Sequence, residues 1–280
     1  MTTSELSYPA GDVVANQALI EAIRNYWNSH IHDLEIATNP VGTEGFFAEL
    51  DEYRFDKLRY LPQLLASEHH RGKELLEVGC GVGTDLVRFA RAGANVTGID
   101  LAETSIDLAR KNFAQNRLQS MLQVMNGEAM SFADNSFDVA YAHGVLQYTA
   151  DAPGMIREIH RVLKPGGQAI LMVYNKYSWL NALSHLMKVD LEHEDAPVLR
   201  KYSIPEFKHL LQPFRNVRLA PERFPVVSRL HGGLKGALYN QLFVRTFNVL
   251  PRALVRPLGW HLMAFAEKQA SEQQGNDDSA

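Results

Sequence analysis

A cluster of glycines and acids between residues 74 and 100 carries the clearest chemical pattern in this chain. A short β-rich run leads into Glu77-Val78-Gly79-Cys80-Gly81-Val82-Gly83-Thr84, and a helical pattern follows it. Glycines at a strand-to-helix turn permit a tight bend and let backbone amides approach a ligand. Asp100 closes the next β-rich run, where a carboxylate can accept hydrogen bonds from both hydroxyls of a ribose. The pattern indicates a nucleoside site.

The acids around this loop distinguish between nucleosides. Glu77 precedes the first glycine, and its negative charge would oppose a pyrophosphate. The spacing G-x-G-x-G lacks the third glycine of the dinucleotide motif G-x-G-x-x-G. Glu128, in Gly127-Glu128-Ala129 after the third β-rich run, could accept a hydrogen bond from the amine of adenine. These acids favour S-adenosylmethionine (SAM), which carries an ammonium and a sulfonium, over NAD or FAD.

The elements that must position these residues repeat one unit from Arg71 to Tyr174. Each unit is a β-rich run, a turn and a helix with apolar residues at helical spacing. Such alternation predicts a doubly wound, parallel α/β sheet. The predicted strands are Glu74 to Val78, Asn95 to Ile99, Met121 to Met125, Phe137 to Ala142 and Gln168 to Tyr174. The clearest helix is predicted to end at Lys164-Pro165-Gly166-Gly167.

Further segments flank this core. Residues 1–70 are expected to form a helical amino-terminal arm or lid, broken near Asn39-Pro40-Val41-Gly42. The main domain is predicted over 71–268, with 176–257 as insertions on the substrate side. Within them, Ser203-Ile204-Pro205-Glu206 has the form of a capping box that opens a helix. The polar tail, 269–280, is expected to be disordered.

Three segments together resemble the class I SAM-dependent methyltransferases of ubiquinone and menaquinone biosynthesis, the methyltransferase type 11 group. They are LLEVGCGVGTDLVRFARAGANVTGIDLAETSIDLAR, NGEAMSFADNSFDVAYAHGVLQY and EIHRVLKPGG, in the order and spacing of that family. The resemblance implies a Rossmann-like, seven-stranded sheet whose last strand, similar to GWHLMAFAEK at Gly259 to Lys268, is antiparallel. It also implies transfer of a methyl group from SAM to an acceptor.

The resemblance also implies where the cofactor is held. Its motif positions, with their neighbours, give a predicted SAM-binding set of Glu77, Gly79, Cys80, Gly81, Gly83, Asp100, Leu101, Glu128, Ala129, Ala142 and His143. One position departs from the family. Relatives often show paired histidines where this chain has Gln147-Tyr148, so a histidine base is not transferred to that position.

His143 is the candidate general base, because it follows the fourth predicted strand beside the expected position of the methyl group. The alternative, a residue that only shapes the pocket or touches SAM, stays open. Candidate substrate contacts are Tyr26, Trp27, Tyr148 and Tyr174. Aromatic residues on a helix, such as Tyr26 and Trp27, more often pack in a core than close over a ligand.

Three other features have a structural alternative to a functional role. Arg54 could meet the carboxylate of SAM or lie on a solvated helix face. Cys80 is expected to pack under the loop, because nothing beside it would lower the pKa of its thiol. The acidic, histidine-containing stretch from His185 to Asp195 lacks a rigid spacing such as H-x-x-x-H. It is predicted to be a solvated loop, and no metal site is expected.

The segment from Arg215 to Arg256 is basic and apolar, with Glu222 as its only acid. We interpret it as a helical insert before the last strand. Three roles stay open: attraction of an anionic, lipid-like acceptor; contact with a membrane surface or a partner chain; and a helix packed on the core with its arginines in water.

Composition narrows the class of protein. The 280 residues are 46% hydrophobic and 21% charged, which suits a soluble, enzyme-sized α/β domain. A net charge of −4 disfavours nucleic acid as the main partner. A lone cysteine excludes an internal disulfide and a multi-thiolate metal site. With no basic-then-apolar start, a cytoplasmic location is expected.

The sequence therefore predicts an enzyme that moves the methyl group of SAM to an oxygen or carbon of a small organic acceptor. Lipid-like, isoprenoid and quinone-like acceptors are all compatible with it. A nicotinamide-dependent oxidoreductase on the same fold and a non-catalytic SAM-binding protein stay open as alternatives. Neither the acceptor nor the oligomeric state follows from the sequence.

Overall fold

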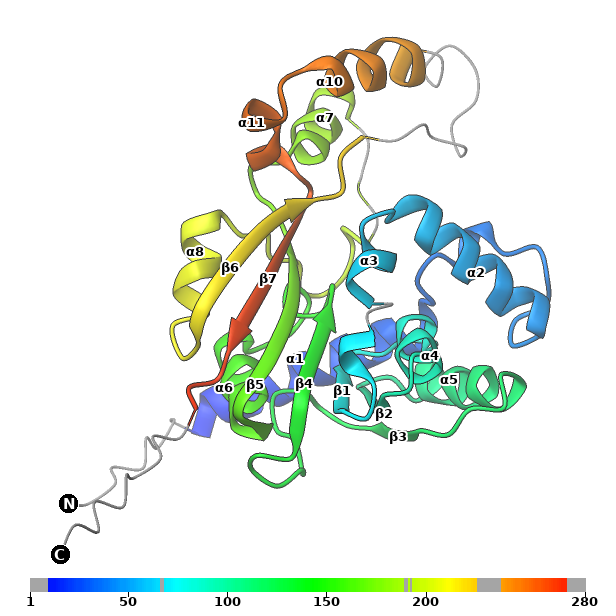
Figure 1. The fold of residues 1–280 in the computed structure, drawn as a ribbon, viewed down its shortest axis with the longest axis vertical. Helices are drawn as coiled ribbons and strands as arrows, with labels where there is room; N and C mark the ends of the chain where they lie inside the picture. Colours follow the sequence, from blue (N-terminus) through cyan, green and yellow to red (C-terminus); the bar gives the residue numbers. More distant parts are fainter. Residues whose placement is uncertain (1–9, 66–67, 189–190, 192, 226–237, 271–280) are drawn as a thin grey trace, which may run out of the picture.

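The fold is described by a computed structural model that covers residues 10–65, 68–188, 191, 193–225 and 238–270 (Figure 1). The predicted disordered tail lies mostly outside the described residues, since 271–280 are not among them. So do residues 226–237, the middle of the predicted basic insert, with Arg229, Leu234 and Lys235.

One seven-stranded sheet forms the centre of the protein, in the order β3-β2-β1-β4-β5-β7-β6. Its strands are β1 (Glu74–Val78), β2 (Asn95–Asp100), β3 (Met121–Val124), β4 (Phe137–His143), β5 (Leu163–Tyr174), β6 (Arg215–Glu222) and β7 (His261–Glu267). The pairs from β3 to β5 are parallel, and β7 is antiparallel to both β5 and β6. The predicted doubly wound sheet with an antiparallel last strand is confirmed.

Strand order reverses between β1 and β4. The chain moves outward from β1 to β2 and β3, then returns to the other side of β1 with β4 and β5. Ligands of open α/β sheets bind at such a switch point, beyond the carboxyl ends of the strands. The residues that follow β1, β2 and β4 therefore meet at one edge.

Helices cover the sheet on both faces because its central strands are apolar on both sides. Leu76 packs in a core with α6 (Ala152–Val162) and α8 (Ile204–Leu210), whereas its neighbour Leu75 packs with α4 (Thr84–Arg91) on the opposite face. The helix α5 (Glu103–Gln115) adds Ile106 and Phe113 to the second core. The predicted capping box at Ser203 and Glu206 is present at the start of α8.

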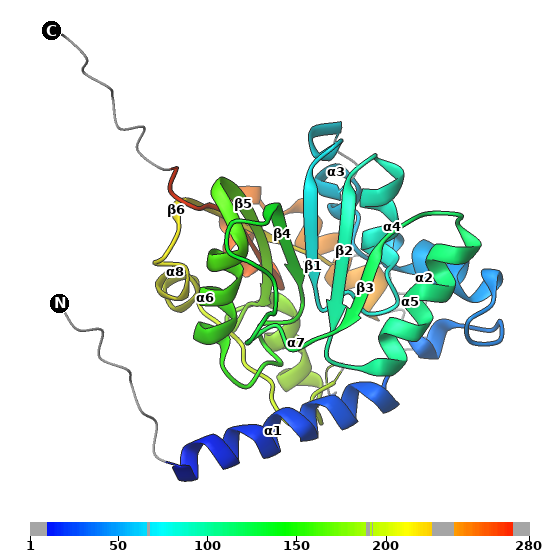
Figure 2. The ribbon, with the colours of Figure 1, turned by 90° about the horizontal axis from the view of Figure 1, so that it is seen from below.

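The amino-terminal arm contains α1 (Ala10–Ser29), η1 (Leu34–Ile36), α2 (Glu44–Lys57) and α3 (Leu61–Leu65), with η2 (Glu68–His70) leading into β1. The predicted break falls between η1 and α2, where Thr43 caps α2 by accepting from the amide of Phe46. Seen from below, α1 crosses under the sheet edge and reaches α5 (Figure 2). Leu58, Leu61 and Leu65 bury the end of the arm in the core beside β1.

The predicted helical insert is wrong over its first eight residues, which form β6. Asn216, Val217, Arg218 and Leu219 alternate polar and apolar side chains, the pattern of a strand with one exposed face. β6 pairs with β7 and covers an edge that would otherwise be open, while the guanidinium of Arg218 lies over the ring of Phe265. Clustered arginines concealed this alternation in the sequence.

The rest of the insert is helical where it is described, as predicted. It contains η3 (Leu238–Val244), α10 (Arg245–Val249), α11 (Arg252–Val255) and η4 (Arg256–Leu258). These helices gather with α7 (Trp179–Met187) beyond the ends of β6 and β7 (Figure 1). Trp179, Phe247 and Val255 form the small core that joins them. We refer to residues 176–188 and 238–258 as the α7–α11 lobe.

Candidate active site

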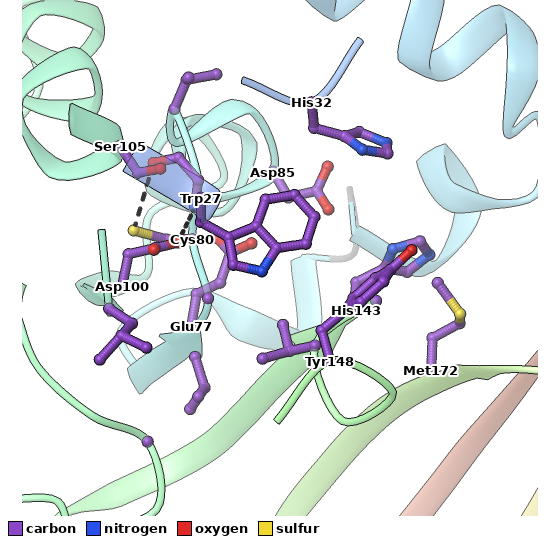
Figure 3. A pocket seen from close by; sticks show the side chains of 18 of the residues that line it. Trp27, His32, Glu77, Cys80, Asp85, Asp100, Ser105, His143, Tyr148 and Met172 are labelled. Carbon is purple, nitrogen blue, oxygen red and sulfur yellow. Dashed lines mark hydrogen bonds between the residues drawn. The ribbon is translucent and has the colours of Figure 1, made fainter. Parts of the chain in front are cut away.

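A cavity of about 220 Å³ opens at the carboxyl edge of the sheet, between the sheet and the amino-terminal arm. At one end lie Glu77 within β1, Asp100 at the end of β2 and Glu128 after β3. At the other lie His143, Tyr174 and His261. Figure 3 shows Trp27 and Tyr148 between the Asp100 end and the Met172 end. The strands thus bring the predicted residues of both ends, together with His261, to one cavity.

The glycine loop is bent as the sequence predicts. Gly79 and Gly81 have positive φ angles of 69° and 53°, which side chains rarely adopt. The amides of Gly79 and Cys80 donate to the carbonyl of Ile99, and the amide of Gly81 donates to the carboxylate of Asp100 at 2.9 Å. The loop is therefore tied to the end of β2, and Asp100 is held beside it.

Glu77 is a buried carboxyl group at the base of the loop, and its Oε2 has no hydrogen-bond partner. Burial and the neighbouring charge of Asp85 raise its pKa well above the ordinary value. A buried carboxyl group without a partner is costly when ionised. An ammonium placed in the cavity would supply the missing partner, so the site fits a cation-bearing ligand.

Asp100 and Glu128 are oriented as hydrogen-bond acceptors. The amides of Gly81 and Ala102 each donate to one oxygen of Asp100 at 2.9 Å, and burial raises the pKa of this carboxyl group. Oε1 of Glu128 accepts from the hydroxyl of Thr149 and from the amide of Ala150. Fixed carboxylates of this kind suit the hydroxyls and the exocyclic amine of an adenosine.

Part of the predicted cofactor set lies away from the cavity. Leu101 and Cys80 line it, but Gly83, Ala129 and Ala142 do not. Gly83 starts α4 with φ 79° and packs on Phe113, whereas Ala142 is fully buried in the core on the other face of β4. Burial raises the pKa of the Cys80 thiol, which agrees with the expectation that it is not a nucleophile.

His143 lies at the far end of the cavity with both ring nitrogens engaged. Nη2 of Arg54 is 3.3 Å from its Nδ1, and the hydroxyl of Tyr60 is 3.0 Å from its Nε2. Burial, followed by the charge of Arg54, lowers the pKa of the imidazole well below its ordinary value. A general base needs a nitrogen free to accept a proton. The geometry therefore does not favour the predicted role of His143 as a base.

Arg54 does not lie on a solvated helix face, since its side chain is only 16% exposed, and its contact with the carboxylate of SAM stays a prediction. Its guanidinium forms a two-point ion pair with Asp85, with Nε 2.6 Å from Oδ1, and the second bond joins Nη2 to Oδ2. The hydroxyl of Tyr141 donates to Asp85 from 2.8 Å. Arg54 thus lines the cavity from the arm and is neutralised by a buried carboxylate at the start of α4.

Beyond Tyr60 the hydrogen bonds continue to the last strand. Its hydroxyl is 2.5 Å from Nδ1 of His261, and Nη1 of Arg223 is 3.1 Å from Nε2 of the same ring. Burial and the charge of Arg223 lower the pKa of His261 well below its ordinary value. Five residues, Arg54, His143, Tyr60, His261 and Arg223, form one hydrogen-bonded chain along this end of the cavity.

Sequence reasoning missed Tyr60, Asp85 and His261 as site residues. Tyr60 stands in the arm with no motif around it, and an acid such as Asp85 is ordinary in the first turn of a helix. His261 belongs to the segment that resembled the last strand, and its polar side chain among apolar neighbours was the one available signal.

The predicted substrate aromatics divide into two groups. Trp27, Tyr148 and Tyr174 line the cavity, and the Trp27 and Tyr148 rings meet edge to face at 5.1 Å. Tyr26 points elsewhere, because its hydroxyl donates to Asp195 at 2.7 Å and its ring stacks on His30. The prediction of Tyr26 as a substrate contact is not supported.

Among the residues that the structure describes, the histidine-containing stretch holds no group of three or more metal-type ligands. Asp190 and Glu192 lie outside the described residues. His193 is half-buried rather than solvated, with its ring 4.8 Å from that of Trp27. Within the described ranges, no helix combines the length and the apolar character needed to cross a bilayer.

Comparison with known proteins agrees with this geometry. Residues 76–171, from β1 to β5, match the family described as "Methyltransferase domain". These residues form a class I SAM-dependent methyltransferase domain. The cofactor of the domain is SAM.

Two curated relatives show what kinds of enzyme share this domain. A ubiquinone biosynthesis O-methyltransferase from Bartonella tribocorum is 29% identical over 154 residues, covering 52% of this chain and 62% of the relative. A sterol 24-C-methyltransferase from Aspergillus fumigatus is 38% identical over 114 residues, covering 39% of this chain and 28% of the relative. The matches therefore leave more than a third of each relative uncovered.

A solved structure extends the likeness beyond the matched domain. Geranyl diphosphate C-methyltransferase from Streptomyces coelicolor, crystallised with Mg²⁺, geranyl diphosphate and S-adenosyl-L-homocysteine, superposes with a TM-score of 0.57 at 15% identity. It covers 89% of this chain and 98% of that one. At this identity the likeness shows a shared fold, and a fold does not determine an acceptor.

Proposed function

We propose that this protein transfers the methyl group of SAM to an oxygen or carbon atom of a small organic acceptor. The observation that carries the proposal is the single cavity that joins Glu77, Asp100 and Glu128 at one end to His143 and Tyr174 at the other. A nucleoside at the first end would leave the second for an acceptor, within the same enclosed space.

The residues at the first end fit the cofactor. Asp100 would accept from the ribose hydroxyls, Glu128 from the amine of adenine, and Glu77 from the ammonium of the methionine part. Gly79 and Gly81 let the backbone of the loop approach the cofactor, because they carry no side chain. A side chain at Gly79 would also collide with Val145. These assignments keep the predicted roles of the cavity-lining residues and leave out Gly83, Ala129 and Ala142.

When bound, SAM supplies a methyl carbon already activated by the sulfonium. The protein then has to align the acceptor with that carbon and exclude water. Trp27 and Tyr148 pack together over the cavity, and His193 packs against Trp27. We propose that these rings close the site, so that the arm acts as the predicted lid.

His143 is proposed as a positioning residue. With Arg54 and Tyr60 at its two nitrogens, its ring is held in place at the far end of the cavity, and Tyr60 supports it from behind the lining. An acceptor that arrives with an ionised oxygen would need no base. This proposal differs from the sequence-based prediction of proton removal by His143.

Calorimetric titration with S-adenosylhomocysteine tests the function. We expect binding in the micromolar range, a loss of at least tenfold in D100A, and no change in the control D107A, whose carboxylate lies on the surface of α5. Binding of NADH without binding of S-adenosylhomocysteine would instead support the oxidoreductase alternative. Tight binding with no methylated product from phenolic, quinone-like or isoprenoid acceptors would support the non-catalytic alternative.

We also propose that the α7–α11 lobe contacts an anionic membrane surface. Its residues, 176–188 and 238–258, include no acid. Lys188, Arg245 and Arg256 are exposed and form no ion pair with an acid among the described residues. Lys176, in contrast, pairs with Glu206. The lobe is thus a basic surface on a chain with a net charge of −4.

The same lobe exposes apolar side chains. The exposed fractions of Leu186, Val249 and Leu254 are 81%, 84% and 70%. Val249 ends α10 and Leu254 lies in α11, two helices found beyond the ends of β6 and β7 (Figure 1). Exposed apolar residues beside arginines are the composition of segments that lie in the lipid interface. A membrane-bound enzyme would meet a lipid-like acceptor there, and a cytoplasmic location stays a prediction.

A further inference from the structure

The chain of hydrogen bonds at the far end of the cavity can be assigned proton by proton. A guanidinium only donates, so Nδ1 of His143 must accept from Arg54. A neutral His143 then carries its proton on Nε2 and donates it to the hydroxyl oxygen of Tyr60. Tyr60 can then give its own proton to Nδ1 of His261, which lies 2.5 Å away.

This assignment uses neutral imidazoles and a neutral phenol. Burial and neighbouring arginines lower the pKa of both histidines, and burial raises the pKa of Tyr60 well above its ordinary value. All three groups therefore hold these protonation states near neutral pH. With Nδ1 accepting, His261 carries its own proton on Nε2.

A conflict follows at the end of the chain. Nε2–H of His261 faces Nη1 of Arg223 across 3.1 Å, and the arginine also only donates. In this arrangement two donors point at one another. The five groups supply five donor protons for four contacts, so in every neutral arrangement one donor lacks an acceptor within the chain. Arg223 forms no ion pair with a described acid, whereas Arg54 is paired with Asp85 and Lys57 with Asp33. Both members of the unsatisfied pair line the cavity.

We propose that Arg223 and His261 together bind an anionic oxygen of the methyl acceptor, a carboxylate or a phenolate. Such an oxygen would take both N–H groups, and every proton in the chain would then have an acceptor. A charge-assisted bond of this kind is about twice as strong as a neutral one. The inference rests on the proposed function and adds the chemical class of its acceptor.

The surroundings define the rest of that acceptor. Leu58, Met172 and Tyr174 line the same end of the cavity, and the Tyr174 ring stacks on that of His261 with 5.8 Å between centroids. An organic anion with a flat, apolar body fits this combination of two donors and apolar walls. A fully neutral acceptor would leave the half-buried Arg223 against His261 without an anionic partner.

The first test addresses the proton assignment itself. Nitrogen-15 NMR of the histidine side chains distinguishes the two neutral tautomers. We expect His261 and His143 to carry their protons on Nε2, with the His261 signal identified by its loss in H261N. A proton on Nδ1 of His261 would overturn the proposal, because Nε2 would then be a satisfied acceptor for Arg223.

The second test is binding of benzoate and of its neutral counterpart benzamide to the protein saturated with S-adenosylhomocysteine. We expect benzoate to bind at least tenfold more tightly and to shift the His261 Nε2–H resonance. R223Q should remove this preference, and R218Q, which changes an exposed arginine on β6, the strand that ends just before Arg223, should preserve it.

Equal binding of the two probes, no binding of benzoate, or a preference retained in R223Q would each overturn the proposal. Affinity for S-adenosylhomocysteine, measured separately in both variants, should stay that of the parent. A protein that failed to bind S-adenosylhomocysteine would contradict the proposed function instead, so the two failures are distinguishable. Thermal unfolding of R223Q near that of the parent would show that the fold is kept.

Discussion

The hydroxyl of Tyr60 lies 2.5 Å from Nδ1 of His261, although 201 positions separate the two residues. Tyr60 belongs to the amino-terminal arm and His261 opens the last strand. One phenol therefore ties the two ends of the fold together behind His143 and His261, which line the cavity.

Replacing this phenol tests how much the tie stabilises the fold. Y60F removes the partner of Nε2 of His143 and of Nδ1 of His261, and leaves both buried groups unsatisfied. We expect the free energy of unfolding to fall by about 1–3 kcal/mol, measured by urea denaturation. Y177F, at an exposed tyrosine of the α7–α11 lobe, should change it little. Equal stability of Y60F and the parent would show that the hydroxyl is not bonded as described.

The ion pair between Arg54 and Asp85 offers a comparison of buried and exposed charges. The exposed fractions of its side chains are 16% and 1%, against 28% and 34% for the similarly two-point pair of Arg88 with Asp51. D85N should lower the free energy of unfolding by about 3–5 kcal/mol, because it leaves Arg54 buried without a counter-charge. D51N should cost under about 1 kcal/mol.

Acid should weaken the buried pair. Burial raises the pKa of Asp85, but the charge and hydrogen bonds of Arg54 outweigh it, so the pKa of the folded state is below the unfolded value. The stability that the pair contributes is then present above the unfolded pKa and is lost as the pH falls through the folded one. Denaturation curves measured from pH 6 downward should show a smaller loss of the free energy of unfolding in R54M/D85L than in the parent. An identical loss in both proteins would contradict this origin.

The contribution of Glu77 to stability should change with pH in the opposite direction to that of Asp85. Its folded pKa is raised by burial and by Asp85, so its contribution to stability is present below the unfolded pKa, near about 4.3. That contribution is lost as the pH rises toward the folded pKa. In the ligand-free state, E77Q should therefore gain stability relative to the parent as the pH rises through this window. E52Q, at an exposed position of α2, should follow the parent.

Cofactor binding should report the same carboxyl group. A bound ammonium favours the ionised form of Glu77, so binding releases a proton and affinity for S-adenosylhomocysteine should rise with pH over that window. E77Q should bind at least tenfold more weakly and with a flatter pH profile. Calorimetry in buffers of different ionisation enthalpy measures the released proton. A steep profile retained in E77Q would assign the proton to another group.

The effects of substitutions at Gly79 and Val145 on stability should depend on one another. Alanine at Gly79 or Gly81 costs about 1–2 kcal/mol, because both have positive φ angles. At Gly79 the new Cβ would also collide with Cγ2 of Val145, whereas at Gly81 nothing lies within 4 Å. G79A should therefore be the less stable variant in urea denaturation. V145A should reduce the cost of G79A and leave that of G81A unchanged, and additive effects in both pairs would exclude the collision.

Membrane contact by the α7–α11 lobe is testable with vesicles. The protein should sediment with phosphatidylcholine vesicles containing phosphatidylglycerol, less with phosphatidylcholine alone, and less at high salt. V249D/L254D should abolish sedimentation. M121D/V124D, at exposed apolar positions on the β3 edge, should sediment like the parent. Sedimentation that survives V249D/L254D, or a lobe that instead pairs two copies in ultracentrifugation, would refute the assignment.

Much of the sheet and one end of the cavity were predictable from local patterns. The strands β1 to β5 and β7 follow runs of apolar residues, and the bend at Gly79 and Gly81 follows from the need for positive φ. Asp100 meets the loop because adjacent parallel strands end at the same edge. Such features depend only on residues that are close in the sequence or on the pairing of two adjacent strands. Residue types and their spacing are enough to predict them.

The other end was decided by the tertiary structure. Arg54 reaches the cavity, and Tyr60 reaches His143, only because the arm packs beside β1. His261 and Arg223 reach it only because β7 pairs between β5 and β6. No local periodicity encodes which of two distant segments will meet, since each long-range contact depends on the packing of all the elements between them. The end of the cavity with Glu77, Asp100 and Glu128 could therefore be predicted from the sequence, whereas the end with His143 and His261 was decided by the tertiary structure.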